Sequence, residues 1–588
     1  MSVLRKRRLD ETVANSDASS SAVDYFRSRF EAELKSEEAV SLLSNHASLS
    51  RDTVQFNEVG TAQYVSAVPS KACTFDSEAT ERNFSVRTSL LANALSKRKS
   101  DSLSVFEESL LQSLCRYVDL YFPLRTNHNE EKIRLVYCLH ALNHVLKTRS
   151  RILQHNAKLK DQSDSKQKER DREQYRDQGF TRPKVLVLVP FRDCALRIVE
   201  LMSQLLFGTD QRSFVTNLKR FRHEYQADPD EKEAMRADMP EDLRRLLSGN
   251  VDDCFRIGLG IAKKSLKLYV DFYSADIVIA SPLGLRMVVG SEGEQLGDYD
   301  FLSSIEVLIL DQADVFLMQN WQHVVHVMER LHKQPKDSHG IDFSRVRTWS
   351  LNGWAPLYRQ TVMFSDIALP ELRAVFSRFC HNFAGVLFFS PVITKTGCLE
   401  KIFVDLPQAF HRFSSADAAK QADDRFNYFT KNVLVQYADS VMSHTLIFIP
   451  SYYDFVRLRN HCKRESYSFV QVCEYTKANK VSRARDMFFH GRKHMLLLTE
   501  RFHFFRRYKI RGIKHLIFYQ LPSYASFYSQ LCNMIQESVS QEPGAIVTCS
   551  VLFSKYDAVR LAAVVGEDKA TKMIGSVENT QVLETVGQ

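Results

Sequence analysis

The chain has 588 residues and a formal net charge of +9, and its composition, 44% hydrophobic and 25% charged, is close to that of an average folded protein. Its eleven scattered cysteines include no Cys-x-x-Cys pair, which argues against structural zinc and a disulfide framework and suits a reducing compartment. Only 20 residues are glycine, and none lies in the 118 residues between Gly60 and Gly179, so this stretch excludes a glycine-rich phosphate loop.

Residues 1–100 are rich in polar side chains and contain only short apolar clusters. We expect residues 1–103 to form a largely disordered N-terminal extension with one short helix around 22–43. The basic run Arg5–Arg8 fits a nuclear import signal and a solvated terminus equally well. No signal peptide is recognisable, and no run approaches the roughly 18 apolar residues of a membrane helix, so no membrane partner is expected.

Apolar residues recur at helical spacing in two segments that follow the extension. These segments span about 104–121 and 130–155, and a highly charged run then covers residues 158–177. We predict two helices followed by a solvated loop or an exposed helix.

Nine short apolar runs, rich in Val, Ile, Leu and Phe, follow along the chain: Val185–Val189, Asp276–Ala280, Ile305–Leu310, Thr361–Phe364, Val386–Phe389, Thr445–Ile449, Met495–Leu498, Ile513–Leu521 and Ala545–Phe553. Runs that are apolar throughout are typical of parallel strands buried on both faces. Their alternation with helical segments predicts an α/β fold with two doubly wound sheets. We place one domain over 104–398, a second over 399–565 and a C-terminal tail over 566–588, with a polar hinge region at about 396–435.

Ligands of such sheets bind at the carboxyl ends of the strands, so the residues directly after each strand are informative. Four of these segments are Pro190-Phe-Arg-Asp-Cys-Ala195, Ser281-Pro-Leu-Gly-Leu-Arg286, Asp311-Gln-Ala-Asp314 and Ser365-Asp-Ile-Ala-Leu-Pro370. In this order and spacing they resemble the motifs of the first RecA-like domain of DEAD-box RNA helicases. His444–Pro450 and Met495–Glu500 are similar to strands of that family's second RecA-like domain. The resemblance covers about residues 104–560 and implies two tandem RecA-like domains.

The chain departs from this family first at the phosphate loop. The best match is Ala141–Thr148, where Lys147 and Thr148 persist but His144 and Leu146 replace the two glycines. Continuous helical spacing predicts that this segment is helix, whose amides make internal hydrogen bonds and offer no anion nest.

Two further departures concern the groups that act on the phosphate. Asp311 and Asp314 match the family, but Gln312 is an amide where the family has the carboxylate that activates the attacking water. Loss of a general base lowers the rate by about 10²–10⁴. The segment Tyr524–Met534, which corresponds to the family's arginine-rich motif, contains no arginine. Because phosphoryl transfer uses all these groups, we expect a degenerate nucleotide site with no catalytic residue, no metal and no cofactor.

Groups that suit RNA are retained after the first strands. Arg192 and Arg286 are guanidinium groups, and Ser281 and Gly284 lie at the start of a predicted helix. Guanidinium groups, hydroxyls and helix N-termini are the groups that bind RNA phosphates. These four residues are therefore candidate RNA contacts.

A second RNA signal is the local charge of the C-terminal part. Residues 441–560 hold 18 basic and 8 acidic residues, and 483–514 alone holds ten Lys or Arg against two acids. Phenylalanines interleaved with these cations either stack on bases or belong to the core. Within this stretch we select Arg501, Arg506 and Arg507 as candidate RNA contacts.

Several segments are similar to one divergent branch of the helicases, the U3 small nucleolar RNA-associated protein 25 family: Leu142–Thr148, Tyr269–Arg286, Tyr299–Glu306 and Asp311–Trp321. The resemblance implies a pseudo-helicase scaffold of the small-subunit processome, where 18S ribosomal RNA matures, in the nucleus and nucleolus. The implied partners are U3 small nucleolar RNA, pre-ribosomal RNA and processome proteins, with no small-molecule substrate. Two alternatives stay open: an active ATP-dependent RNA helicase with an atypical nucleotide site, and a pure protein–protein scaffold.

Overall fold

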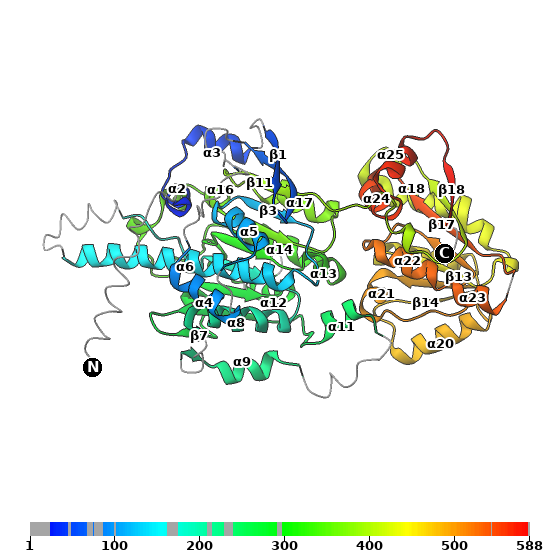
Figure 1. Cartoon of the computed structure of the whole chain (residues 1–588), viewed down its shortest axis with the longest axis horizontal. Coiled ribbons are helices and arrows are strands. Elements are labelled where there is room, and N and C mark those ends of the chain that lie inside the picture. The colour runs from blue at the N-terminus through cyan, green and yellow to red at the C-terminus, as the bar shows by residue number, and fades with distance from the viewer. Residues whose placement is uncertain are drawn as a thin grey trace.

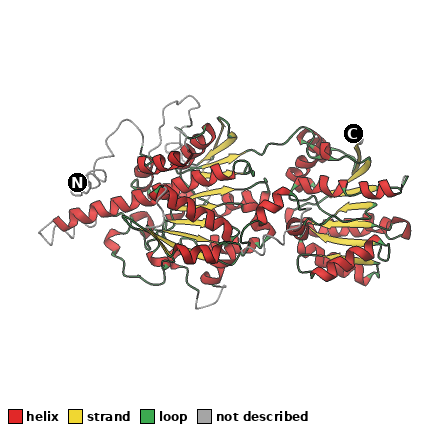
Figure 2. Ribbon diagram, turned by 60° about the horizontal axis from the view of Figure 1, so that its bottom comes forward, coloured by secondary structure: helices red, strands yellow, loops and turns green. Residues whose placement is uncertain are grey.

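The computed structural model describes residues 24–44, 49–67, 75, 86–98, 102–161, 175–208, 214–227, 239–290, 297–542 and 544–585. These residues build two α/β units, one on an eleven-stranded sheet and one on a seven-stranded sheet, which lie next to each other in Figures 1 and 2. The predicted fold class, two tandem doubly wound sheets dominated by parallel strands, is confirmed. Within the described ranges, no helix has the length and apolar character needed to cross a membrane.

The centre of the first sheet is a block of neighbouring parallel strands. In spatial order they are β11 (Val386–Phe389), β3 (Asp119–Phe122), β10 (Gln360–Phe364), β9 (Val307–Leu310), β4 (Val185–Leu188) and β8 (Ile277–Ala280). Every residue of β3, β4, β8, β9 and β10 is buried, because helices cover both faces of the sheet. This burial explains why the runs are apolar throughout.

Other strands extend the block at both edges. Beyond β11 lie β2 (Gly60–Ser66) and β1 (Ser50–Phe56), each antiparallel to its neighbour. Beyond β8 lie β6 (Arg256–Ile261), β7 (Leu266–Leu268) and the short β5 (Val215–Thr216).

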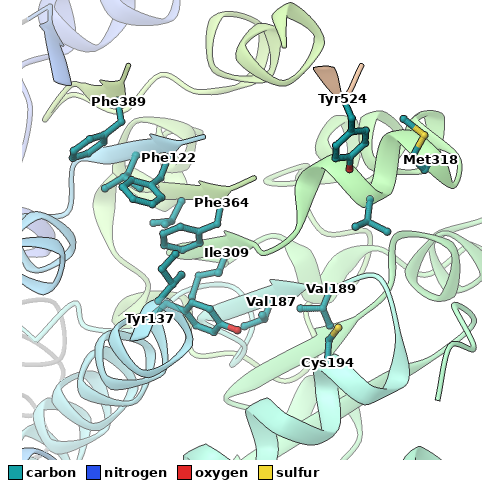
Figure 3. Packing of buried hydrophobic residues seen from close by; sticks show 14 of the residues in the cluster. Phe122, Tyr137, Val187, Val189, Cys194, Ile309, Met318, Phe364, Phe389 and Tyr524 are labelled. Carbon is teal, nitrogen blue, oxygen red and sulfur yellow. The ribbon is translucent and has the colours of Figure 1, made fainter. Parts of the chain in front are cut away.

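The helices of the first unit pack around this sheet: α2 (Tyr25–Phe30), α3 (Ser36–Leu43), α4 (Thr88–Arg98), α5 (Val105–Cys115), α6 (Glu130–Asp161), α8 (Arg192–Phe207), α9 (Leu218–Tyr225), α12 (Pro282–Val289), α13 (Ala313–Met318), α14 (Trp321–Arg330), α15 (Thr348–Leu351), α16 (Ala355–Tyr358) and α17 (Pro370–Phe379). A further helix, α11 (Glu241–Leu247), lies between the two units. Figure 3 shows the core between them, where the ring centroid of Phe122 lies 5.9 Å from that of Phe364 and 5.1 Å from that of Phe389. Aromatic side chains from β3, β10 and β11 therefore pack against one another across the sheet.

The second sheet has the spatial order β14 (Phe469–Val472), β15 (Met495–Thr499), β13 (Thr445–Ile449), β16 (His515–Phe518), β17 (Thr548–Phe553), β12 (Leu406–Arg412) and β18 (Thr580–Thr585). Its helices are α18 (Gln421–Tyr428), α19 (Tyr452–Arg464), α20 (Ala478–Phe489), α21 (Glu500–Arg506), α22 (Ala525–Asn533), α23 (Gln536–Gln541), α24 (Ala558–Val565) and α25 (Glu567–Gly575). Among the strands that the structure describes in this sheet, β18 alone runs antiparallel to its neighbour. All nine predicted apolar runs contain a strand of one of the two sheets.

The helix predicted over 104–121 is wrong at its C-terminal end. The helix α5 stops at Cys115, and Asp119–Phe122 form β3, a central strand. Pairing with β10 and β11 on both sides outweighs the local helical spacing of the apolar residues. The consequence concerns the carboxyl edge of the sheet, because the loop after β3 lies there beside Asp311.

The described parts of both terminal regions are more ordered than predicted. Within 1–103, helices α2 and α3 and the β1–β2 hairpin pack on the first unit, with Phe26 and Phe30 buried. Most of residues 1–23 and 68–85, where the extension is also predicted to be disordered, lie outside the described residues. Within 566–588, the predicted tail forms α25 and β18, and β18 pairs with β12. Edge strands of this kind have a weak sequence signal, because much of their stability comes from the sheet they join.

Candidate functional site

The carboxyl edge of the first sheet brings Asp311 against an arginine that the sequence did not reveal. Asp311 directly follows β9, and Arg125 lies in the loop between β3 and α6. The Nε atom of Arg125 donates to Asp311 Oδ1 at 2.9 Å, and its Nη2 atom donates to Glu130 Oε2 at 3.0 Å. The hydroxyl of Tyr137 donates to Asp311 Oδ2 at 3.0 Å. Both carboxylate oxygens of this buried aspartate are therefore engaged by the protein itself.

The loop after β3, residues 123–129, contains no glycine and uses its own amides. The Arg125 N–H donates to the Ser365 carbonyl at 3.0 Å, and the Thr126 N–H donates to Asn129 Oδ1 at 2.7 Å. Asn129 also donates from Nδ2 to the Leu124 carbonyl. A phosphate nest needs several free N–H groups that point to one spot, and the N–H groups of Arg125, Thr126 and Asn129 are already bonded within the fold.

The segment predicted to be the remnant of the phosphate loop lies elsewhere. Residues 141–148 are helical, as predicted, but they lie in the middle of α6, which runs back from the carboxyl edge to the amino edge of the sheet. His144 pairs with Glu306, which precedes β9, whereas Asp311 follows β9. Five residues of extended strand separate the two acids by roughly 16 Å. The prediction that His144–Thr148 share one site with Asp311 is therefore wrong, and the loop that lies at the edge of Asp311 is 123–129.

At the amino edge, these α6 residues have structural partners. His144 lies 3.2 Å from Glu306 and 3.1 Å from the Tyr117 hydroxyl, and burial lowers the pKa of its imidazole. The Leu146 carbonyl accepts a hydrogen bond from Arg87 at 3.1 Å. Lys147 Nζ lies 2.9 Å from an Asp24 carboxylate oxygen, at the start of α2. These contacts fasten the N-terminal helices to the first unit.

Gln312 and Asp314 do lie at the carboxyl edge, as predicted. Gln312 begins α13 with a left-handed backbone (φ 60°), and its Nε2 atom donates to Cys194 Sγ at 3.2 Å. Asp314 accepts from the Tyr524 hydroxyl at 2.7 Å and from the Asp366 N–H at 3.1 Å. Burial raises the pKa of Asp314, and burial together with the Asp314 charge raises the pKa of Asp366 to about 7.

Tyr524 belongs to the second unit, so its bond to Asp314 joins the two units. Figure 3 shows its ring beside α13. The residue caps α22, in the segment where the resembling helicases have arginines. A neutral hydroxyl thus reaches the first unit at this position.

The helix α11 lies between the units in Figure 1 and adds a second link. Asp242 on α11 lies 3.3 Å from Arg507 Nη2 of the second unit, and Arg245 lies 3.3 Å from Glu130 of the first. Leu243 on the same helix is buried. A cavity of about 300 Å³ remains, lined by residues of both units and of α11 that include Arg125, Gln312, Asp314, Asp366, Leu243, Arg507 and Tyr524.

Three of the predicted RNA-binding residues have structural roles. Arg192 donates to the carbonyls of Glu224 and Cys254 and pairs with Asp252 at 2.9 Å. Ser281 is the N-cap of α12, accepting from the Gly284 N–H at 2.9 Å. A Cβ atom at Gly284 would lie 2.1 Å from the Phe255 carbonyl oxygen, so this glycine permits a close backbone approach.

The basic stretch 483–514 gives a mixed outcome. Phe488, Phe502 and Phe504 are buried in the core, so the core interpretation holds for these aromatic rings. Arg507 is buried too, with its guanidinium 4.5 Å from the Phe527 ring centroid, and burial lowers its pKa. Arg506 is exposed.

Arg501 lines a cavity between the units, and the charge of Arg286 acts on another residue of that cavity, His323. A cavity of about 250 Å³ lies between the units and is lined by Pro282, Leu283, Asn320, His323, Tyr475 and Arg501, among others. Arg501 donates to the Leu317 carbonyl at 3.5 Å. Burial is the main cause that lowers the pKa of His323, and the positive charge of Arg286 lowers it further. His323 and Tyr475 carried no sequence signal, because they lie one turn into α14 and in the loop after β14.

The strand order of the first sheet, with Asp311 and the loop 123–129 at its carboxyl edge, defines an α/β protein of the NTP hydrolase-like class. Two family models match the chain: "UTP25, NTP hydrolase-like domain" over residues 117–387 and "Utp25, C-terminal domain" over residues 398–583. The chain belongs to the U3 small nucleolar RNA-associated protein 25 family.

Individual relatives agree with this assignment. The "U3 small nucleolar RNA-associated protein 25 homolog" of Xenopus tropicalis is 48% identical over 492 residues, 84% of this chain and 63% of that protein. The family member of Schizosaccharomyces japonicus is 40% identical over 486 residues, 82% of this chain and 73% of that protein. The matched part of the chain thus spans less than two thirds of the Xenopus protein. The crystal structure of the yeast DEAD-box splicing factor Prp28 is 12% identical and covers 89% of this chain and 88% of its own, with a TM-score of 0.30, which supports no argument.

Proposed function

We propose that this protein is a non-catalytic scaffold that binds RNA within the assembly that matures the small ribosomal subunit. The contact between Arg125 and Asp311 carries the non-catalytic part of this proposal. A metal ion bound to a nucleotide would have to reach the carboxylate of Asp311 after β9. The guanidinium of Arg125 already lies against that carboxylate. A protein cation that is already paired at this point competes with both the metal and the phosphates.

The neighbouring groups do not fit a nucleotide with Mg²⁺ either. Mg²⁺ binding in such sites uses a free carboxylate oxygen and substrate phosphates, whereas both oxygens of Asp311 are bonded to protein groups. The loop 123–129 lacks glycine, and Gln312 is not a base. The Tyr524 hydroxyl is neutral and already donates to Asp314, so it supplies no positive charge to stabilise the negative charge that develops on a phosphate during hydrolysis.

The assembly and the RNA partner are inferred from relatives and from charge. The names of the relatives associate those proteins with U3 small nucleolar RNA. For this chain we infer association with U3 and pre-ribosomal RNA, processome proteins as neighbours, a nucleolar location and a role in 18S ribosomal RNA maturation. As RNA contacts we choose Arg501, which lines the cavity between the units, and Arg286, whose charge acts on His323 at the same cavity.

ATP hydrolysis by the purified full chain, with and without RNA, tests the non-catalytic claim. We expect turnover equal to that of the Asp311→Ala variant in both conditions. RNA-stimulated turnover that disappears in Asp311→Ala would instead establish the alternative, an active helicase.

Crosslinking of RNA to the protein in cells, followed by sequencing, tests the RNA claim. We expect reads from U3 and pre-ribosomal RNA that decrease in an Arg286→Glu/Arg501→Glu variant. An Arg492→Glu variant is the control, because Arg492 is exposed in the second unit away from this cavity. Absence of crosslinks with intact assembly would favour a pure protein scaffold.

A further inference from the structure

A second cavity opens at the amino edge of the first sheet, opposite to Asp311. Its volume is about 370 Å³, and α6, the segment 178–184 and the residues Tyr273, His339 and Ile341 line it. None of these residues lines the cavities between the two units. The cavity is therefore independent of the proposed RNA face and of the degenerate nucleotide site.

The walls of the cavity are largely apolar. Val145, Ile152 and Leu153 line it from α6, and 56% of the Leu153 surface is exposed. Opposite to them, the rings of Tyr273 and His339 stack with their centroids 4.1 Å apart. A volume of this size with aliphatic and aromatic walls accommodates one bulky apolar side chain.

Two polar groups of α6 at this cavity have no partner among the described residues. Thr148 is 4% exposed, and its Oγ1 atom is buried without a hydrogen bond in the described part of the chain. Arg149, the next residue, makes no ion pair with any residue that the structure describes. A buried hydroxyl without a partner is unfavourable in the free protein, so a ligand that bonds to it removes this cost.

The other charged groups at the cavity are already neutralised. Arg182 donates to both carboxylate oxygens of Asp276, at 2.8 and 3.0 Å. Lys184 lies 3.3 Å from Glu306, and burial lowers its pKa. Arg149 is thus the cation available to a ligand, and Lys158 and Lys160 continue an exposed basic surface along α6.

We propose that this cavity binds a peptide segment of a partner protein that inserts one bulky apolar side chain and presents a carboxylate to Arg149 and Thr148. An acidic peptide complements the basic side of α6, while the aliphatic wall and exposed Leu153 suit an apolar anchor residue. Nucleic acid fits less well, because Arg149 is the one cation of the lining without an ion-pair partner among the described residues, whereas binding of nucleic acid relies on several such cations.

Selection of phage-displayed random peptides on the purified full chain tests the proposal. We expect enriched peptides to combine an aromatic or long aliphatic residue with Asp or Glu within a few positions. A labelled synthetic peptide of the enriched sequence is then titrated by fluorescence anisotropy. Leu153→Arg should weaken binding by roughly tenfold or more, the effect of losing one buried anchor contact.

Charge reversal and a hydroxyl deletion make the test specific. Arg149→Glu should weaken binding of the acidic peptide and restore binding of a peptide whose acid is changed to Lys. Thr148→Val should weaken peptide binding yet raise the thermal midpoint of the free protein, because Val has the same shape and no unsatisfied hydroxyl. Val435→Arg, at a similarly exposed site in the second unit, should change neither quantity.

Three outcomes would overturn the proposal. They are a selection that enriches no peptide, enriched peptides whose binding is unchanged by Leu153→Arg and Arg149→Glu, and displacement of the peptide by a short RNA that itself loses binding in both variants. The last outcome would assign the cavity to RNA instead. None of these results depends on whether the cleft between the units binds RNA, so failure here and failure of the proposed function can be distinguished.

Discussion

Arg125 and Asp311 form a buried ion pair, with Nε and Oδ1 2.9 Å apart and both side chains almost fully inaccessible. Arg125 lies in the loop after β3, and Asp311 directly follows β9. These two strands flank β10 at the centre of the first sheet. The loop after β3 thus supplies a cation to the acid after β9, and the charges of the two groups are balanced within the fold.

Replacing Arg125 by Ala should destabilise the first unit by about 3–5 kcal/mol, since it leaves the Asp311 carboxylate buried without its cation. Denaturant unfolding of the full chain measures this loss.

The double variant Arg125→Ala/Asp311→Asn is the matched control for this effect. A neutral Asn still accepts from the Tyr137 hydroxyl, so the double variant should be more stable than Arg125→Ala alone. Equal stability of the two variants would show that the charge of Asp311 is not what Arg125 neutralises.

Tyr524→Phe should loosen the contact between the two units, because it removes the hydroxyl that donates to Asp314 across the cleft. The expected cost is about 1–3 kcal/mol for leaving a buried acceptor with fewer partners. Small-angle scattering, or fluorescence transfer between labels on the two units, reports the opening.

Tyr528→Phe on the same helix tests whether the effect is specific to the cleft. The Tyr528 hydroxyl donates to Gln408 within the second sheet, at 2.6 Å. This variant should lower the stability of the second unit and leave the distance between the units unchanged. Equal opening in both variants would argue that Tyr524 acts only through the stability of its own domain.

The sequence predicts the strands well but not which loop lies beside Asp311. Strands buried on both faces are apolar at every position, and that signal is local. β3 was missed because its four residues continue the helical spacing of α5, and only pairing with β10 and β11 makes them a strand. Because β3 has no strand signal of its own, the sequence pattern favours the Lys147-Thr148 pair of α6, which lies at the opposite edge of the sheet.

The ion pair at the site was also out of reach of sequence reasoning. Arg125 and Asp311 are separated by most of the first domain, and nothing in the local sequence of either residue indicates the other. The same holds for Asp242 on α11 and Arg507. Basic residues interleaved with aromatic residues predict an RNA-binding surface. Phe502, Phe504 and Arg507 are nevertheless buried, because α21 packs against α22, and this packing has no signal in the local sequence.

RNA binding in vitro should weaken uniformly across sequences when Arg286 and Arg501 are both changed to Glu. Contacts to phosphates carry little sequence information, and loss of two such contacts should reduce the slope of log K against log salt by about 1–2. Titration of a single-stranded RNA at several salt concentrations measures the slope. An unchanged slope with weaker binding would place the effect in the fold of the cleft, and Arg492→Glu should alter neither property.

The stability of the second unit should fall as the pH rises from about 4.5 to 7, because of one buried acid. Glu500 accepts from the Ser523 N–H at 2.7 Å and from its hydroxyl at 2.9 Å, and burial raises the pKa of its carboxyl group to about 7. Below the unfolded-state pKa, near 4.5, the group is protonated in both states and folding is unaffected. Between the two values the unfolded chain releases a proton that the folded chain retains, so unfolding becomes more favourable.

Glu500→Gln should therefore raise the thermal midpoint at about pH 8 and leave it nearly unchanged near pH 4.5. The amide oxygen accepts from the Ser523 N–H and the amide nitrogen donates to the Ser523 hydroxyl, so both contacts are retained. The gain at the higher pH is on the order of 3 kcal/mol at most. Scanning calorimetry at both pH values measures the difference. Glu542→Gln is the control, since Glu542 is exposed and paired with Lys514 at 2.6 Å, and it should give no gain. An equal gain at both pH values would mean that packing, rather than the proton, distinguishes Gln from Glu at position 500.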